Sequence, residues 1–143
     1  MILPLKNLRC SPIGLVPKKA PGEFRLIHHL SWPEGQSDND FIYPSMSSVK
    51  YSSFDDAIEL VQQAWHECEL AKCDIKSAFR LLPIHPDDFE LVGFSFNDKY
   101  YFDKAMPMGC SVSCSMWVKF STFIQWLVQK EAQKGLVMHY LKD

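Results

Sequence analysis

The stretch AKCDIKSAFRLLPIHPDD, residues 71–88, decides the expected fold. Its first residues belong to ELAKCDI, residues 69–75, a short segment that favours β-structure and is bounded by polar residues. We predict a strand here that ends near Asp74. An aspartate at the end of a strand is more often a turn residue or a cap than a ligand. Position alone therefore favours a structural role for Asp74.

The last residues, HYLKD at 139–143, repeat this arrangement. The apolar run Leu136-Val137-Met138 predicts a strand from Leu136 to Leu141 that brings Asp143 to its tip. Neighbouring strands lie about 5 Å apart, so carboxylates at two adjacent tips could share a divalent cation. Pairs of such cations catalyse phosphoryl transfer. Asp74 and Asp143 are thus candidate catalytic and metal-binding residues.

The remaining segments predict an α+β fold. Residues 11–19 and 23–31 read as two strands joined by the turn Ala20-Pro21-Gly22, and a long loop follows over 31–48. A capping serine, Ser52 or Ser53, starts a helix that continues to about residue 68. Residues 91–109 contain a second hairpin with its turn at Asn97-Asp98, and apolar periodicity over 111–134 predicts a long helix.

The composition indicates a folded domain, or part of one. Of the 143 residues, 47% are hydrophobic. The net charge is −2, so the chain lacks the overall positive charge that is typical of nucleic-acid-binding domains. The apolar N-terminus is too short for a signal peptide or a membrane span. Five cysteines without a C-x-x-C pair indicate reduced thiols. We therefore expect an intracellular protein, cytoplasmic or nuclear, that is not secreted and has no membrane partner.

The cysteines leave one alternative for metal binding. Cys110 and Cys114 are spaced i, i+4 and could bind zinc together with His66 or His139. Small buried side chains are the simpler interpretation of the two cysteines.

Four motifs, in order, resemble those of reverse transcriptases, the RNA-directed DNA polymerases of retroelements. The motifs are SPIGLVPKKAPGEFRLIHHLS (11–31), AKCDIKSAFRLLPIHPDD (71–88), KAMPMGCSVSCSMW (104–117) and HYLKD (139–143). The sequences of these motifs are most similar to those of the polymerases of DIRS-like retrotransposons. The resemblance implies a right-hand polymerase: a fingers hairpin and loop over 1–50, and a partial palm over 51–143. The palm would be an antiparallel sheet backed by two long helices. Thumb and RNase H regions are expected to be absent.

The resemblance also assigns roles to individual residues. It implies that Asp74 and Asp143 bind Mg²⁺ or Mn²⁺, and that dNTPs and an RNA or DNA primer-template are the partners. Residues expected to bind the nucleotide are Lys18, Arg25, Ile75, Phe79, Met108 and Gly109. Lys18 and Arg25 would offset the charge of the triphosphate. Phe79 would exclude a 2′-hydroxyl on the incoming nucleotide. Lys19, His28 and His29 could contact the template strand. For the two histidines we instead expect packing in the strand or on its surface.

One departure affects the expected activity. The family carries Tyr-x-Asp-Asp where this chain has Tyr140-Leu141-Lys142-Asp143, so Lys142 replaces a metal-binding acid. An ammonium group cannot bind a cation and repels it, so we expect this copy to be inactive as a polymerase. Two alternatives stay open: a non-catalytic domain that keeps the fold to bind nucleic acid or protein, and an unrelated α+β protein with coincidental strand-tip acids.

Overall fold

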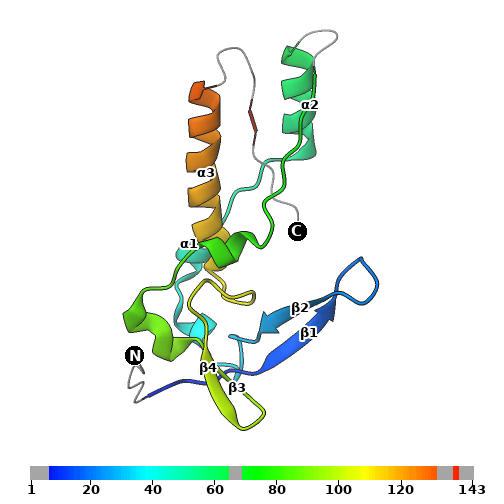
Figure 1. Cartoon of the computed structure of the whole chain (residues 1–143). Coiled ribbons are helices and arrows are strands. Elements are labelled where there is room, and N and C mark those ends of the chain that lie inside the picture. The colour runs from blue at the N-terminus through cyan, green and yellow to red at the C-terminus, as the bar shows by residue number, and fades with distance from the viewer. Residues whose placement is uncertain (1–6, 65–68, 132–136, 139–143) are drawn as a thin grey trace.

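The computed structural model describes residues 7–64, 69–131 and 137–138. In these residues the chain is a mixed α/β protein with two small antiparallel sheets of two strands each. Figure 1 shows the two hairpins at one end of the molecule, with the two longer helices extending away from them. The α+β class expected from the sequence is therefore confirmed at this coarse level.

The first hairpin matches its prediction closely. Strand β1, Ile13–Pro17, pairs with β2, Phe24–His28, in the register Ile13↔His28. Gly22 lies in the turn with φ of +78°, a conformation that residues with a side chain rarely adopt. The predicted turn residues 20–22 thus connect the strands as expected.

The loop over 31–48 contains two single helical turns that its composition did not predict. A 3₁₀ turn spans Asp38–Phe41, and α1 spans Pro44–Ser47. Ser37 begins the first of these with a capping box, in which its hydroxyl lies 2.6 Å from Asp40 Oδ2. A short turn held by local hydrogen bonds is typical of Ser/Asp/Asn-rich sequence.

Helix α2 spans Phe54–Gln63 and begins as expected. Ser53 is the N-cap: its Oγ accepts a hydrogen bond from the Asp56 amide, while Asp56 accepts one from the Ser53 amide at 2.6 Å. These hydrogen bonds lower the pKa of Asp56. The predicted continuation to residue 68 falls partly at 65–68, outside the described residues.

The second hairpin pairs β3, Gly93–Phe96, with β4, Lys99–Phe102. Asn97 and Asp98 have φ of +50° and +58°, the pair of positive values that a two-residue type I′ turn requires. The segment before β1 meets the second hairpin through a parallel bridge between Cys10 and Gly93.

The long helix α3 spans Ser113–Glu131, against a predicted range of 111–134. Its buried side includes Ser113, Trp117 and Ser121. In the described part of the chain few large apolar side chains are buried: Leu30, Phe89, Val92 and Trp117. The core is therefore small and lies where the hairpins meet the start of α3.

Two predicted strands are not confirmed. Residues 69–75 form no strand, so the prediction of a strand that ends at Asp74 is wrong. The cause is physical: residues 69–74 are exposed, and no other described segment pairs with their backbone in a ladder. The predicted strand at Leu136–Leu141 lies largely outside the described residues, and positions 137–138 within it have no strand assignment.

Candidate functional site

The first hairpin brings two of the predicted nucleotide-binding cations together. Val16 pairs with Arg25, and the amide of Lys18 donates to the Glu23 carbonyl, which continues the same register. Paired residues, and residues two apart on one strand, share a face of a sheet. Lys18 and Arg25 are therefore diagonal neighbours on one face of the hairpin.

Lys18 already has a partner on that face. Its Nζ lies 3.0 Å from a carboxylate oxygen of Glu23, and both side chains are well exposed. An exposed pair of this kind is worth little, about 0–1 kcal/mol. An incoming anion can therefore displace Glu23 at small cost.

The base of the hairpin is joined to the turn that contains Met108 and Gly109. The amide of His28, the last residue of β2, donates to the Met108 carbonyl at 2.7 Å. Gly109 has φ of +117°, and a Cβ built on it would overlap the His28 carbonyl oxygen. Glycine is thus required here because the two backbones approach so closely.

Asn39 adds a second link at the same place. Its amide nitrogen lies 2.8 Å from both Ser31 Oγ and the Gly109 carbonyl, and its carbonyl accepts from the Ser111 amide. The loop, the hairpin and the start of α3 are therefore fixed to one another around Gly109. Sequence reasoning missed Asn39, since one asparagine in a polar loop gives no distinguishing signal.

A buried polar network lies directly behind this junction, and it too was missed. His28 is 3% exposed, and its Nε2 lies 2.9 Å from the Gly93 carbonyl oxygen, to which it donates. Its Nδ1 is 3.6 Å from Asp103 Oδ2, and Arg80 Nη1 is 2.6 Å from Asp103 Oδ1. The expected packing of His28 in its strand is confirmed. The sequence did not predict the neighbouring contacts of Asp103 with His28 and Arg80.

The charge state of Asp103 follows from its neighbours. Burial acts to raise its pKa, but the contacts with His28 and Arg80 outweigh burial, so the pKa of Asp103 is lowered. The carboxylate therefore stays ionised and ties the end of the second hairpin to the 3₁₀ turn Ala78–Leu81, which carries Arg80. His29, in contrast, is exposed and stacks on Trp32.

The segment that follows Asp74 is connected to the same region. Phe79 is half-buried in a 3₁₀ turn, Ala78–Leu81, which follows Ser77 in a left-handed conformation with φ of +55°. The Met106 amide then donates to the Leu82 carbonyl, and the Ile84 amide to the Lys104 carbonyl. The motif at residues 71–88 is therefore hydrogen-bonded to the residues that precede the Pro107–Gly109 turn.

Asp74 itself is not brought into a defined site. It is exposed in irregular chain, and Ile75 beside it is half-buried. Lys142 and Asp143 lie outside the described residues. The structure thus brings together Lys18 with Arg25, and joins Met108 and Gly109 to the base of their hairpin, while Asp74 stays exposed in irregular chain.

The donors in the described residues do not fit a metal centre. No group of three or more His, Cys, Asp or Glu side chains among them is arranged to hold a metal ion. The resemblance implies that Asp74 and Asp143 bind Mg²⁺ or Mn²⁺, and of these two only Asp74 lies within the described residues. Cys110 and Cys114 are half-buried, and burial raises the pKa of the Cys110 thiol, which disfavours the thiolate that zinc requires.

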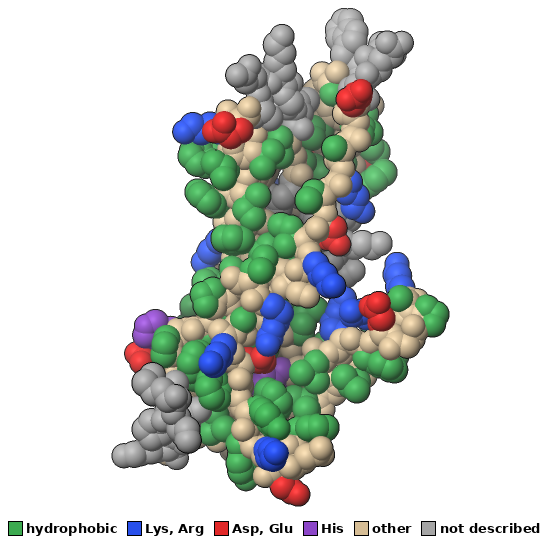
Figure 2. Space-filling model, in the orientation of Figure 1, with side chains coloured by type: hydrophobic (Ala, Val, Ile, Leu, Met, Phe, Trp, Pro, Cys, Tyr) green, Lys and Arg blue, Asp and Glu red, His purple; other side chains and the backbone are tan. Residues whose placement is uncertain are grey.

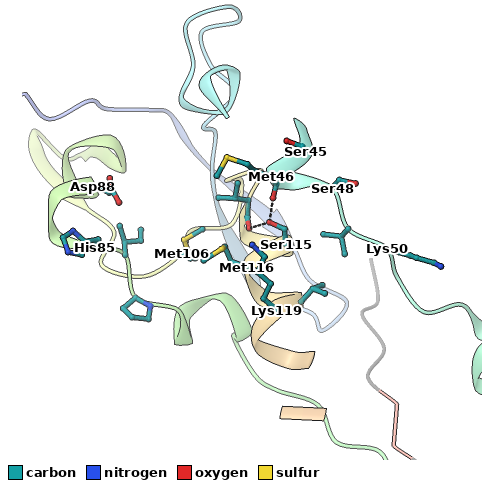
Figure 3. A pocket seen from close by; sticks show the side chains of 15 residues that line it. Ser45, Met46, Ser48, Lys50, His85, Asp88, Met106, Ser115, Met116 and Lys119 are labelled. Atoms are coloured by element: carbon teal, nitrogen blue, oxygen red, sulfur yellow. Dashed lines mark hydrogen bonds between the residues drawn. The ribbon is translucent and has the colours of Figure 1, made fainter. Parts of the chain in front are cut away.

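A shallow hollow of about 790 Å³ lies beside the start of α3. Figure 3 shows Met46, Met106 and Met116 lining it, and Ser115, whose hydroxyl lies 2.6 Å from the Met46 carbonyl, connects α1 to α3 at its edge. None of the residues predicted to bind metal or nucleotide lines this hollow. The candidate site is therefore the Lys18–Arg25 face and the Met108–Gly109 junction, rather than this hollow.

Comparisons of the chain with protein-family models, with curated proteins and with solved structures found no match. No helix in the described part of the chain is long and apolar enough to cross a membrane.

Proposed function

We propose that this chain is the fingers hairpin and part of the palm of a reverse transcriptase of a retroelement, similar to DIRS-like elements, that binds nucleotides but does not polymerise them. The four ordered motifs support this proposal, since a chance match to all four is far less expected than a match to one. In it, residues 1–50 are the fingers part and 51–143 the palm part.

The observation that carries the proposal is the arrangement around Gly109. Lys18 and Arg25 lie on one face of a hairpin whose base is bonded to Met108, although the two segments are some eighty residues apart in sequence. These are the residues to which the resemblance assigns the nucleotide. Two cations on a fixed hairpin suit the triphosphate, whose oxygens form charge-assisted hydrogen bonds with Lys and Arg.

The loss of polymerase chemistry in the proposal has two causes. Lys142 stands where the family has a metal-binding acid, and a lysine there opposes cation binding. Asp74 is exposed and not held on a strand. Since catalytic groups must be held close to their productive geometry, an acid at 142 alone would not rebuild the site.

Primer extension tests the claim about polymerisation. The purified chain is incubated with a primed RNA or DNA template, dNTPs and either Mg²⁺ or Mn²⁺. We expect no extended primer from the wild-type chain or from Lys142→Asp. Extension that is abolished by Asp74→Asn would contradict the proposal of an inactive copy, and extension by Lys142→Asp alone would show that the lysine is the only defect.

A second candidate is a non-catalytic domain that uses the same fold to bind nucleic acid or protein. The exposure of many large apolar side chains favours it, because such patches mark interaction surfaces. The two candidates differ in one result: nucleotide binding that depends on Lys18 and Arg25 supports the first, and its absence from a well-folded chain supports the second.

A further inference from the structure

Helix α2 has an apolar stripe that the described chain leaves uncovered. Phe54, Ile58 and Val61 are spaced by four and three residues, which places them on one side of the helix. All three are exposed, Phe54 to 73%, and no residue of α2 is buried. A helix with so strong a separation of apolar and polar sides usually packs its apolar side on something.

Helix α3 has a matching stripe that borders its buried side, where Phe120 contacts Trp117. Met116, Phe120, Phe123 and Leu127 repeat with spacings of four, three and four residues. They are exposed, Phe123 to 55%, while the adjacent residues Trp117 and Ser121 are buried. Figure 2 shows exposed hydrophobic side chains over the part of the surface formed by the long helices.

The charges beside the two stripes are opposite in sign. Helix α2 carries Asp55, Asp56 and Glu59 and has no Lys or Arg within its bounds. Helix α3 carries Lys119 and Lys130, with one acid, Glu131, at its end. Lys119 is one turn from Phe123, and Lys130 lies over the ring of Trp126 at 5.3 Å. Two α3 stripes facing each other would bring lysines together, whereas α2 facing α3 pairs acids with lysines.

The lengths of the two stripes also agree. At about 1.5 Å per residue, the stripe on α2 extends about 10 Å and that on α3 about 16 Å. The α2 stripe therefore fits within the α3 stripe, with room for Lys119 or Lys130 to reach the acidic first turn of α2.

We propose that two copies of this chain associate, with α2 of each copy lying on the exposed stripe of α3 of the other. A twofold axis makes the two contacts equivalent and closes the assembly at a dimer. The contact buries both stripes and places Asp55 and Glu59 of one copy near the lysines of the other. This inference does not depend on the proposed nucleotide binding.

The oligomeric state of the whole chain tests the inference. Sedimentation equilibrium is expected to show a reversible monomer–dimer equilibrium. Phe54→Asp and Phe123→Asp, both at exposed positions, are each expected to raise the dissociation constant by about thirtyfold or more, as at an interface hot spot. Tyr100→Asp is the matched control, because Tyr100 on β4 is 75% exposed and lies outside both stripes. Circular dichroism confirms that each variant is folded.

Charge exchange gives a second readout that leaves the apolar contacts intact. Asp55→Lys and Lys119→Glu are each expected to weaken the dimer several-fold, because each places like charges together, and the double variant is expected to recover most of the loss. A monomer at every concentration, open-ended aggregation, or a dimer unaffected by both phenylalanine variants would overturn the inference. Equal weakening by Tyr100→Asp would overturn it as well.

Discussion

At Gly109 the structure gives a physical reason for a glycine that the sequence motif only points out. The resemblance gives it a nucleotide contact, and the structure gives it a mechanical role that does not depend on any ligand. Its φ of +117° and its approach to the His28 carbonyl both exclude a side chain. The fixed position of the hairpin relative to α3 therefore depends on this glycine.

Substitution of Gly109 measures that role. Gly109→Ala is expected to destabilise the fold by about 3 kcal/mol, from backbone strain of about 1–3 kcal/mol and the clash with His28. Gly22→Ala is the control, since Gly22 also has a positive φ but nothing lies within 4 Å of an added Cβ. Urea denaturation gives both values. Equal losses in the two variants would show that the contact with His28 has no energetic weight.

At this scale the sequence motifs marked individual residues but did not indicate which distant residues would contact one another. The motif order indicated Lys18 and Arg25, and the structure places both on one face of the hairpin. Nothing in the pattern indicated that His28 would meet Asp103 and Arg80, because these residues are 75 and 52 positions away along the chain. Such contacts depend on tertiary packing, which a local pattern does not encode.

Helix α2 shows which element-scale predictions succeed. Its start was predicted from a local signal, a capping serine at 52 or 53, and the structure shows a capping box at Ser53. The hairpin turn at Asn97-Asp98 was predicted for the same reason, since both residues tolerate positive φ. Caps and turns of this kind involve only a few neighbouring residues, so they can be predicted from the sequence without knowledge of the rest of the fold.

The cap of α2 can be tested by hydrogen exchange. Ser53→Ala removes the hydroxyl that accepts from Asp56 and is expected to lower the free energy of opening of the first turn by about 1 kcal/mol. The sequence left Ser52 and Ser53 as equal candidates, so Ser52→Ala is the natural control and is expected to leave exchange unchanged. The reverse result would contradict the assignment of the cap.

The failed strand at 69–75 shows the limit at this scale. Its residues favour β-structure, but a strand forms only when another strand accepts its hydrogen bonds. The described chain pairs each hairpin within itself and leaves 69–75 without such a partner. The propensity for β-structure is a property of these residues alone, and it does not indicate whether a partner strand is present.

At the scale of the whole molecule, two hairpins and α3 meet at one junction. His28 contacts Gly93, Asp103 and Met108, so the end of β2 bonds to the other hairpin and to the turn before α3. The small core lies at this junction, whereas the exposed stripes of α2 and α3 lie outside it. The proposed nucleotide site uses the hairpin that is bonded to the junction, and the proposed dimer uses the two helices that extend from it.

The most direct test of the central claim is a titration of the chain with a dNTP in the presence of Mg²⁺. The account predicts saturable binding that weakens by about tenfold or more in Lys18→Ala and in Arg25→Ala, since each removes a charge-assisted hydrogen bond. Glu23→Gln, which frees Lys18, is predicted to bind at least as tightly as wild type, and Lys99→Ala on the other hairpin to bind equally. Binding that is absent, or equally weakened by Lys99→Ala, would contradict the account.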